Sequence, residues 1–193
     1  GGFVHMGEGV DVNVITPVNR RKKLLIADMD STIIGCECLD ELADMAQLKP
    51  QIAEITERAM NGEIAFEPAL RERVGLLKGL ALEALERTYN ERVKLNSGAK
   101  ALVASMKKHG ARTCLVSGGF TYFTERIAKA VGFDDQQGNT LLDDGKRLTG
   151  EVKEPILGRE AKLAALNAEI KKLNISAYEA LAVGDGANDL GMI

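Results

Sequence analysis

Aromatic side chains are scarce in this chain of 193 residues. Tryptophan is absent, and Phe, Tyr and Trp together make up 4% of the residues. Proteins that bind single-stranded nucleic acid usually stack its bases on aromatic rings, so this scarcity argues against such a role. The formal net charge is −3, whereas a general nucleic-acid binder usually carries a basic face. We therefore expect no nucleic-acid partner.

Long apolar runs are lacking as well. No run approaches the ~18 residues needed to span a bilayer, and no signal peptide is recognisable at the start, so we expect no membrane association. The three cysteines, Cys36, Cys38 and Cys114, do not have the spacing of a disulfide framework. A small, odd number of cysteines fits a reducing compartment better than a secreted fold. We therefore expect a cytoplasmic location.

The order of patterns along the chain predicts an α/β fold with a helical insertion. Residues 1–22 carry little helix or strand signal, and we set them apart as an N-terminal tail or scar. Residues 23–35 and 97–193 alternate short apolar runs with helical patterns, which predicts a Rossmann-like parallel sheet with flanking helices. Residues 36–96 show apolar spacings of three and four only, which predicts a small helical cap inserted after the first strand.

Three predicted strands of the sheet each end in polar residues. These ends are Asp28 and Asp30 after Leu24–Ala27, Ser117-Gly118-Gly119 after Arg112–Val116, and Gly184–Asp189 after Ala180–Val183. We expect Ser117-Gly118-Gly119 to form a tight turn. Ligands of open parallel sheets bind beyond the carboxyl ends of the strands. The sequence therefore predicts a site where the three ends meet.

The acids at the first strand end suit phosphoryl transfer. In extended backbone the carboxylates of Asp28 and Asp30 point the same way, and they repel each other unless a cation or a shared proton intervenes. A hard divalent ion such as Mg²⁺ satisfies them, with Asp185 as a third carboxylate. Asp28 is then suited to attack phosphorus and form an aspartyl-phosphate. Asp30 is suited to move protons to and from the reacting oxygens.

The other strand ends offer partners for a phosphate group. The Ser117 hydroxyl and the Gly118 N–H are suited to hold phosphate oxygens where charge develops, and Lys162 is a candidate to offset that charge. Each motif alone has an ordinary explanation: acids after a strand cap helices, Ser-Gly-Gly forms turns, and a lysine on a helix is usually solvated. Their occurrence in order, each after a predicted strand, favours a magnesium-dependent phosphomonoesterase.

These segments resemble the four motifs of the haloacid dehalogenase-like (HAD) superfamily. The motifs are Asp28-Met29-Asp30-Ser31-Thr32, Ser117-Gly118-Gly119-Phe120, Lys162 and Gly184-Asp185-Gly186-Ala187-Asn188-Asp189. The resemblance runs from about Lys22 to the last residue and includes the cap segments Glu57–Gly62 and Phe66–Arg73. The cap segments are similar to those of members that act on phosphoserine. The resemblance therefore implies hydrolysis of O-phospho-L-serine to L-serine and phosphate, the last step of serine biosynthesis.

The resemblance also implies a role for each site residue. Asp28 would be the nucleophile and Asp30 the general acid and base. Magnesium would be held by Asp28, the backbone carbonyl of Asp30 and Asp185, with Asp189 supporting the metal site from nearby. Phosphate would be bound by Ser117, Gly118 and Lys162, with Asn188 close to it. The substrate would be read by Glu37 at its ammonium, by Arg73 at its carboxylate, and by Met60 and Phe66 as an apolar part of the cap.

Two alternatives remain open. In the first, the chain is a related phosphatase or phosphotransferase of the same superfamily that acts on another small phosphomonoester. In the second, it is an inactive, truncated binding fragment. The second arises because the sequence stops at Ile193, where family members continue, so we expect the C-terminal part of the core to be missing. The pair Glu37 and Arg73 favours an amino-acid phosphate. The retention of Asp28 together with Asp30 favours turnover over mere binding.

Overall fold

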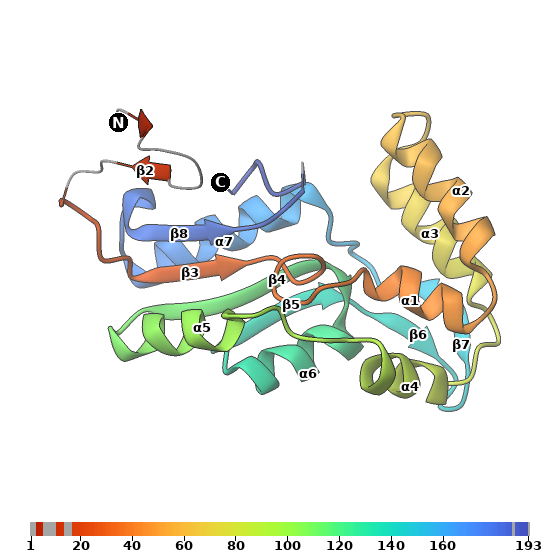
Figure 1. Ribbon diagram of the computed structural model, residues 1–193. Coiled ribbons are helices and arrows are strands. Elements are labelled where there is room, and N and C mark those ends of the chain that lie inside the picture. The colour runs from red at the N-terminus through yellow and green to blue at the C-terminus, as the bar shows by residue number, and fades with distance from the viewer. Residues whose placement is uncertain (1–2, 6–10, 14–16, 187, 193) are drawn as a thin grey trace.

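The computed structural model describes residues 3–5, 11–13, 17–186 and 188–192, and Figure 1 traces the chain. The main sheet has four parallel strands in the order β5-β4-β3-β8. They are β3 (Leu24–Ala27), β4 (Arg112–Phe120), β5 (Asp135–Asn139) and β8 (Ala180–Val183). Two antiparallel pairs accompany it, β1 (Phe3–His5) with β2 (Asp11–Asn13) and β6 (Leu141–Asp143) with β7 (Leu148–Val152). The predicted parallel α/β fold is confirmed.

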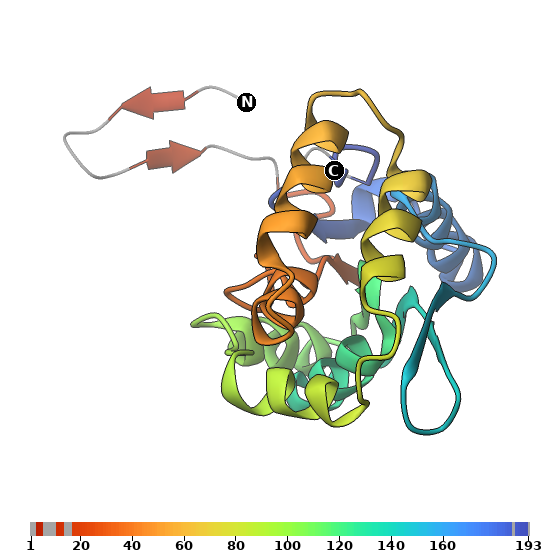
Figure 2. The ribbon, with the colours of Figure 1, turned by 90° about the vertical axis from the view of Figure 1, so that its right-hand side faces the viewer.

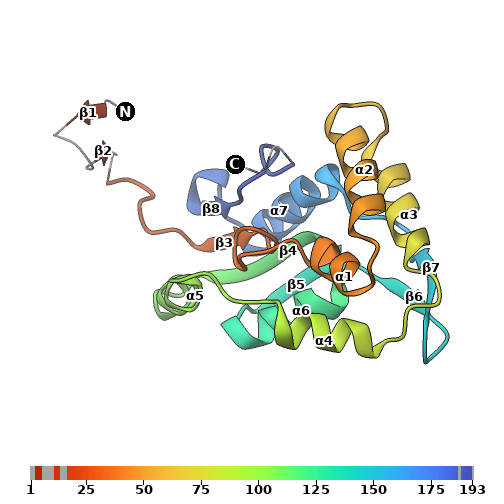
Figure 3. The same ribbon diagram turned by 45° about the vertical axis from the view of Figure 1, so that its right-hand side comes forward.

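The helices fall into two groups. Four follow β3 directly: α1 (Cys38–Met45), α2 (Lys49–Met60), α3 (Phe66–Leu76) and α4 (Glu83–Glu91). Three others cover the sheet: α5 (Ala99–Lys108), α6 (Thr121–Val131) and α7 (Arg159–Leu173), and a 3₁₀ turn, η1 (Ala177–Glu179), precedes β8. In Figures 1 and 3 the first group gathers beyond the end toward which β3 points. Figure 2 views that end, where α2 and α3 stand side by side.

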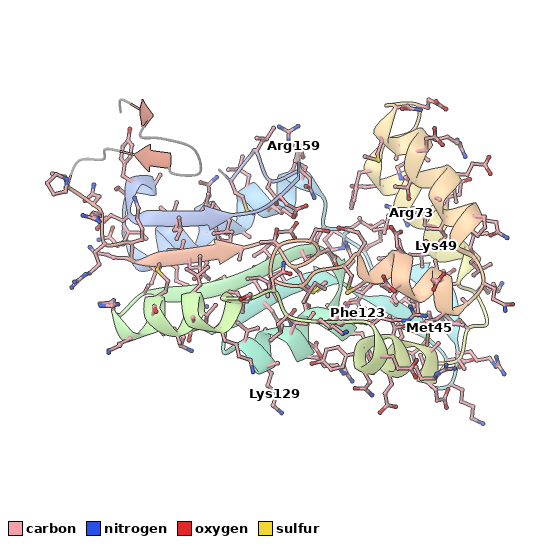
Figure 4. All side chains as sticks on the ribbon, in the orientation of Figure 1. Met45, Lys49, Arg73, Phe123, Lys129 and Arg159 are labelled. Carbon is pink, nitrogen blue, oxygen red and sulfur yellow. The ribbon has the colours of Figure 1, made fainter. Side chains whose placement is uncertain are left out.

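Helices cover both faces of the sheet, which explains why its strands are continuous apolar runs. Successive side chains of a strand point to opposite faces. Leu25 therefore belongs to a buried cluster with Val103 of α5 and Phe123 of α6, and Phe123 is labelled in Figure 4. Leu24 belongs to a second buried cluster with Leu166 of α7. The strand β3 is fully buried between these two layers.

The strand β3 occupies the point where the sheet topology changes direction. Its residue Ala27 pairs with Leu115 of β4 on one side and with Val183 of β8 on the other. The chain thus builds β4 and β5 to one side and returns through α7 to add β8 to the opposite side. Such a switch point leaves a crevice beyond the carboxyl ends of the strands, and the three predicted polar segments follow those ends.

The helical block α1–α4 packs on the sheet end and on the β6–β7 hairpin. Buried residues of the block, such as Leu42 and Leu70, belong to the same apolar cluster as Leu115 of β4. The backbone joining α3 to α4 is hydrogen-bonded to the hairpin, through Leu148 N–H to Leu80 O at 2.9 Å among others. The division of the chain into a core at 23–35 and 97–193 and a cap at 36–96 stays a proposal.

One local prediction was wrong, and one strand was not predicted. Ser117-Gly118-Gly119 is not a tight turn, because β4 continues through it to Phe120 with a register irregularity between Val116 and Phe120. The glycines suggested a turn locally, but pairing of Phe120 with Asn139 keeps the segment extended. The strand β5 was missed altogether. Its sequence, Asp-Gln-Gln-Gly-Asn, carries no apolar pattern, so only pairing with β4 makes it a strand.

The ends of the chain are described in part. The predicted tail at residues 1–22 includes stretches outside the described residues, and within its described part β1 pairs with β2. Ala187 of the last motif and Ile193 also lie outside the described residues. A search of the described helices finds none with the length and apolar character to cross a membrane.

Candidate active site

The loop after β3 carries the first pair of acids into the crevice. Backbone pairing with β8 continues for one more residue, because Asp28 N–H donates to Val183 O at 2.9 Å. The chain then turns back, as the N–H groups of Ile33 and Ile34 both donate to Met29 O. At the tip of this turn Ser31 has a φ of +53°. The turn leaves the side chains of Asp28 and Asp30 on the wall of one cavity.

Lys162 lies beneath this cavity and contacts two acids. Its Nζ is 2.8 Å from Asp28 Oδ2 and 2.7 Å from Asp189 Oδ1. The side chains of Lys162 and Asp189 are 2% and 0% exposed, respectively. Burial raises the pKa of the Asp28 carboxyl, and the Lys162 ammonium opposes that rise. Paired, hydrogen-bonded charges are the form in which a protein interior accommodates such groups.

Asp30 has a different environment from Asp28. Its Oδ1 accepts a hydrogen bond from the Cys38 N–H at 3.0 Å, at the start of α1, and its Oδ2 accepts one from the Ser117 hydroxyl at 3.5 Å. Burial raises the pKa of the Asp30 carboxyl to about 7, against the Cys38 bond, and the charge of Glu37 adds to the rise. A carboxyl group with this pKa is suited to give and take protons near neutral pH.

The β4 segment after Val116 approaches these acids closely. Ser117 is 2% exposed, and its Oγ accepts a hydrogen bond from the Gly119 N–H at 2.9 Å. A Cβ on Gly119 would lie 2.7 Å from Asp30 Oδ2, a distance that real side chains do not tolerate. Glycine at this position therefore permits the close approach of backbone to carboxylate.

Three carboxylates form a cluster with the geometry of a cation site. Oxygen atoms of Asp28, Asp185 and Asp189 all lie within 4.8 Å of one another. Thr32 Oγ1 donates to Asp185 Oδ1 at 2.6 Å, and Gly186 N–H donates to Asp189 Oδ2 at 3.1 Å. An all-oxygen set of carboxylates is the donor set of hard divalent cations. The residues present therefore fit a divalent metal ion.

The cavity that joins these groups has a volume of about 260 Å³. Its wall combines the three strand ends with side chains of the helical block: Asp28, Asp30, Glu37, Leu39, Phe66, Leu70, Arg73, Ser117, Gly118, Gly119, Phe120, Asp185, Gly186 and Asn188. The Glu37 carboxylate accepts a hydrogen bond from the Ser31 hydroxyl at 2.6 Å. Arg73 is half-buried, and Figure 4 shows it on the side of the helical block that faces the sheet.

The predicted site residues are thus brought together with one exception. Met60, at the end of α2, is 83% exposed and is not on the cavity wall. Phe66 is on the wall, and its ring covers Gly118: a Cβ on that glycine would lie 3.4 Å from Phe66 Cζ. Lys162 and Asp189 lie behind the wall and reach the site through Asp28.

Two residues that support this site were not predicted from the sequence. Asn139 is 1% exposed and bonds three backbone groups: its amide donates to Gly118 O at 2.8 Å and to Leu157 O at 3.0 Å, and its Oδ1 accepts from Leu157 N–H at 2.8 Å. It ties the segment Ser117-Gly118-Gly119 to the chain that leads into α7 and Lys162. The second residue is Thr56, which contacts Arg73. Neither stands in a motif, so no local signal marks them.

Acids and a hydroxyl at the carboxyl ends of parallel strands, with a buried lysine of α7 beside them, form the kind of site in which α/β proteins bind their ligands. In agreement, the model of the haloacid dehalogenase-like hydrolases matches residues 25–193. The chain belongs to this family.

Two curated relatives narrow the comparison. The phosphoserine phosphatase of Archaeoglobus fulgidus is 45% identical over 188 residues, which cover 97% of this chain and 54% of that protein. The phosphoserine phosphatase of a Polaromonas species is 45% identical over 192 residues, which cover 96% of this chain and 81% of that protein. The chain therefore spans about half the length of the first relative and four fifths of the second.

A solved structure of a phosphoserine phosphatase is similar to this chain as well. A phospho-aspartyl intermediate analogue of a phosphoserine phosphatase superposes with a TM-score of 0.80 at 38% identity. The superposition covers 90% of this chain and 82% of that one. The similarity therefore extends through the helical block as well as the sheet.

Proposed function

We propose that this chain is a phosphoserine phosphatase, which hydrolyses O-phospho-L-serine to L-serine and phosphate as the last step of serine biosynthesis. One observation carries the proposal. The Asp28 carboxylate, paired with the buried Lys162, lies on a cavity wall that also holds an acid and an arginine of the helical block, Glu37 and Arg73. The first pair suits phosphoryl transfer, and the second suits an amino-acid substrate.

The reaction proceeds in two steps. An oxygen of Asp28 attacks phosphorus, and the bond between phosphorus and the serine oxygen breaks to leave an aspartyl-phosphate. Asp30 donates its proton to the departing serine oxygen in this step. A water molecule then attacks phosphorus, Asp30 takes a proton from it, and phosphate is released while Asp28 is restored. The raised pKa of Asp30 supports this dual role.

Donors around Asp28 hold the phosphate group through both steps. The Lys162 ammonium offsets charge on the phosphate oxygens, and the Ser117 hydroxyl and Gly118 N–H donate to them. Asn188 lies on the same wall and adds an amide nearby. The buried position of Lys162 supports this role, because its charge is little screened by solvent.

The metal is proposed to be Mg²⁺, held by Asp28, Asp185 and the backbone carbonyl of Asp30, with Asp189 close by. The carboxylate cluster supports a divalent ion. When bound, the ion supplies positive charge that lets an anionic carboxylate approach an anionic phosphate.

The helical block is proposed to recognise the rest of this small-molecule substrate. Glu37 pairs with its ammonium group, and Arg73 with its carboxylate, a pairing for which guanidinium geometry is well suited. Phe66 excludes water from above Gly118. Met60 is exposed and is not on the cavity wall, so its contact with the substrate stays a prediction. The cytoplasmic location stays a prediction.

Phosphate release from a panel of phosphomonoesters, with Mg²⁺ and with a chelator, tests the proposal. We expect magnesium-dependent turnover with O-phosphoserine preferred over an aryl phosphate, and no turnover in the Asp28→Asn variant. Calcium in place of magnesium should fail, because its looser coordination misplaces the nucleophile. Normal turnover by Asp28→Asn would refute the mechanism. Product analysis with an added alcohol separates hydrolysis from phosphotransfer.

A further inference from the structure

The guanidinium of Arg73 is held by two acceptors of the helical block. Its Nε donates to Ala69 O, one turn earlier on α3, at 3.3 Å. Its Nη1 donates to Thr56 Oγ1, on the neighbouring helix α2, at 3.4 Å. Within the described part of the chain Nη2 makes no recorded hydrogen bond, and Arg73 lines the cavity. These two contacts hold the guanidinium at Nε and at one N–H of Nη1, which leaves the second N–H of Nη1 and the N–H groups of Nη2 for a ligand.

The Thr56 hydroxyl is itself oriented. Its proton is directed to Ile52 O at 2.9 Å, in the preceding turn of α2. A hydroxyl that donates in one direction still has lone pairs to accept with. Because its proton is already used, Thr56 meets the arginine as an acceptor, which is the role that a cation requires.

Without these two contacts, the Arg73 guanidinium would be attracted by nearby acids. Burial lowers the pKa of Arg73, and the negative charges of Asp40 and Glu37, at the start of α1, oppose that lowering. The same acids attract the guanidinium toward α1. An acceptor on α2 and a carbonyl on α3 counter this attraction. Arginine side chains carry large rotamer entropy, so each fixed contact lowers the cost of meeting a carboxylate in one geometry.

We propose that Thr56 is a positioning residue, which holds the Arg73 guanidinium in the orientation that receives the carboxylate of the substrate. The proposal rests on the proposed function, in which Arg73 binds that carboxylate. Thr56 acts through Arg73 and does not touch the reacting atoms. It therefore governs discrimination between phosphate esters with and without a carboxylate, and not the rate of phosphoryl transfer.

The chain offers a matched control at Thr88 of α4. Its hydroxyl also donates to the carbonyl four residues earlier, Ala84 O, at 2.8 Å, and its side chain is buried. Thr88 is not on the cavity wall. Threonine-to-valine changes at the two positions remove the same kind of helix bond and conserve shape, but only the change at Thr56 removes an acceptor from Arg73.

The experiment compares Thr56→Val, Thr56→Ser and Thr88→Val on O-phosphoserine and on O-phosphoethanolamine, which lacks the carboxylate. We expect Thr56→Val to raise KM for phosphoserine about three- to tenfold, as loss of one hydrogen bond predicts. Its kcat should stay within about twofold, and both constants for phosphoethanolamine should be unchanged. Thr56→Ser should behave as wild type, because it keeps the hydroxyl. Thr88→Val should leave the ratio of the two substrates unchanged.

Two outcomes would overturn the inference. One is an equal effect of Thr56→Val on both substrates, and the other is an effect no larger than that of Thr88→Val. In an Arg73→Met background, Thr56→Val should add no further loss on phosphoserine, and a full additional loss would also refute it. Failure of the proposed function looks different: wild-type protein would then show no preference for phosphoserine over phosphoethanolamine. Thermal unfolding of each variant identifies any loss that comes from misfolding.

Discussion

The ammonium group of Lys162 lies 2.8 Å from the carboxylate of Asp28, and the lysine side chain is 2% exposed. Asp28 lies in the loop after β3, whereas Lys162 lies in the first turn of α7. The same ammonium contacts Asp189, so two buried carboxylates share one buried ammonium. Removing the ammonium leaves both carboxylates without their lysine partner.

We predict that Lys162→Met lowers kcat/KM for phosphoserine by about 10²–10³-fold, the usual effect of losing one donor to developing negative charge. The variant should also be less stable by about 3–5 kcal/mol, because it leaves buried charges unpaired. Steady-state kinetics and urea unfolding measure the two effects. Lys171→Met, at an exposed position of the same helix, is the control and should change neither. Activity within tenfold of wild type would exclude a phosphate-binding role for Lys162.

The environment of Asp30 predicts a pH dependence of the first chemical step. The leaving oxygen needs a proton, and the pKa of Asp30 is raised by burial to about 7. The protonated fraction therefore falls as pH rises through 7, and with it the rate of serine release in a single turnover. An aryl phosphate has a better leaving group and needs this proton less. The rate with phosphoserine divided by the rate with the aryl phosphate should therefore fall above pH 7.

Asp30→Asn supplies the matching comparison. It should lose far more activity on phosphoserine than on the aryl phosphate in the first step, because an amide does not donate a proton to an alkoxide. At pH 7 and above both substrate phosphates are mostly dianionic, so their ionisation contributes little to the ratio there. A ratio that stays flat from pH 6 to pH 8.5 would show that Asp30 is not the acid.

The Asn139 side chain is expected to hold the segment Ser117-Gly118-Gly119 in place. Asn139→Asp replaces an amide donor by a carboxylate that faces two carbonyl oxygens, those of Gly118 and Leu157. We predict a loss of about 1–3 kcal/mol in stability, typical of a buried group without its partner, and a raised inhibition constant for inorganic phosphate. Asn167→Asp adds the same charge at an exposed position of α7 and should change neither. An unaltered phosphate inhibition constant would limit Asn139 to a structural role.

The contrast between Asp28 and Asn139 shows how far the sequence could lead. The strands Leu24–Ala27 and Ala180–Val183 were predictable, because a sheet covered on both faces selects short apolar runs. The acids and glycines that follow them were therefore placed correctly at one edge. Asn139 ends a strand with no apolar pattern, and its partners are backbone groups distant in sequence. Such a residue is defined by tertiary pairing alone.

The helical block shows the same limit. Its helices follow from apolar spacing, and Glu37 and Arg73 do lie on one cavity wall. Its hydrogen bonds to the β6–β7 hairpin were not predictable, because backbone pairing such as that of Leu80 with Leu148 leaves no mark on side-chain type. The exposure of Met60 was not predictable either, since the apolar character of a side chain does not reveal which way its helix end faces.

A final prediction concerns stability and pH, away from the active site. Asp134 accepts hydrogen bonds from the Thr113 N–H at 2.9 Å and hydroxyl at 3.0 Å, and its other oxygen is 2.6 Å from Lys107 Nζ. Burial raises the pKa of Asp134, but the bonds from Lys107 and Thr113 outweigh it, and the net pKa is lowered. Asp134 thus binds a proton less tightly in the folded protein than in the unfolded chain. The carboxylate therefore stabilises the fold above the unfolded pKa of about 3.9, and this stabilisation is lost as pH falls through the lower folded value.

Asp134→Asn should consequently destabilise the protein at pH 7, where the wild-type carboxylate is charged, by about 1–2 kcal/mol. The difference between variant and wild type should shrink as pH falls from about 4 through the lowered pKa of folded Asp134, because the wild-type side chain then becomes neutral too. Urea unfolding at both pH values measures the difference directly. Glu54→Gln, which removes an exposed carboxylate without recorded partners among the described residues, should show little difference at either pH. A loss in Asp134→Asn that is equally large at low pH would mean that shape and neutral hydrogen bonds, and not the charge, give Asp134 its effect.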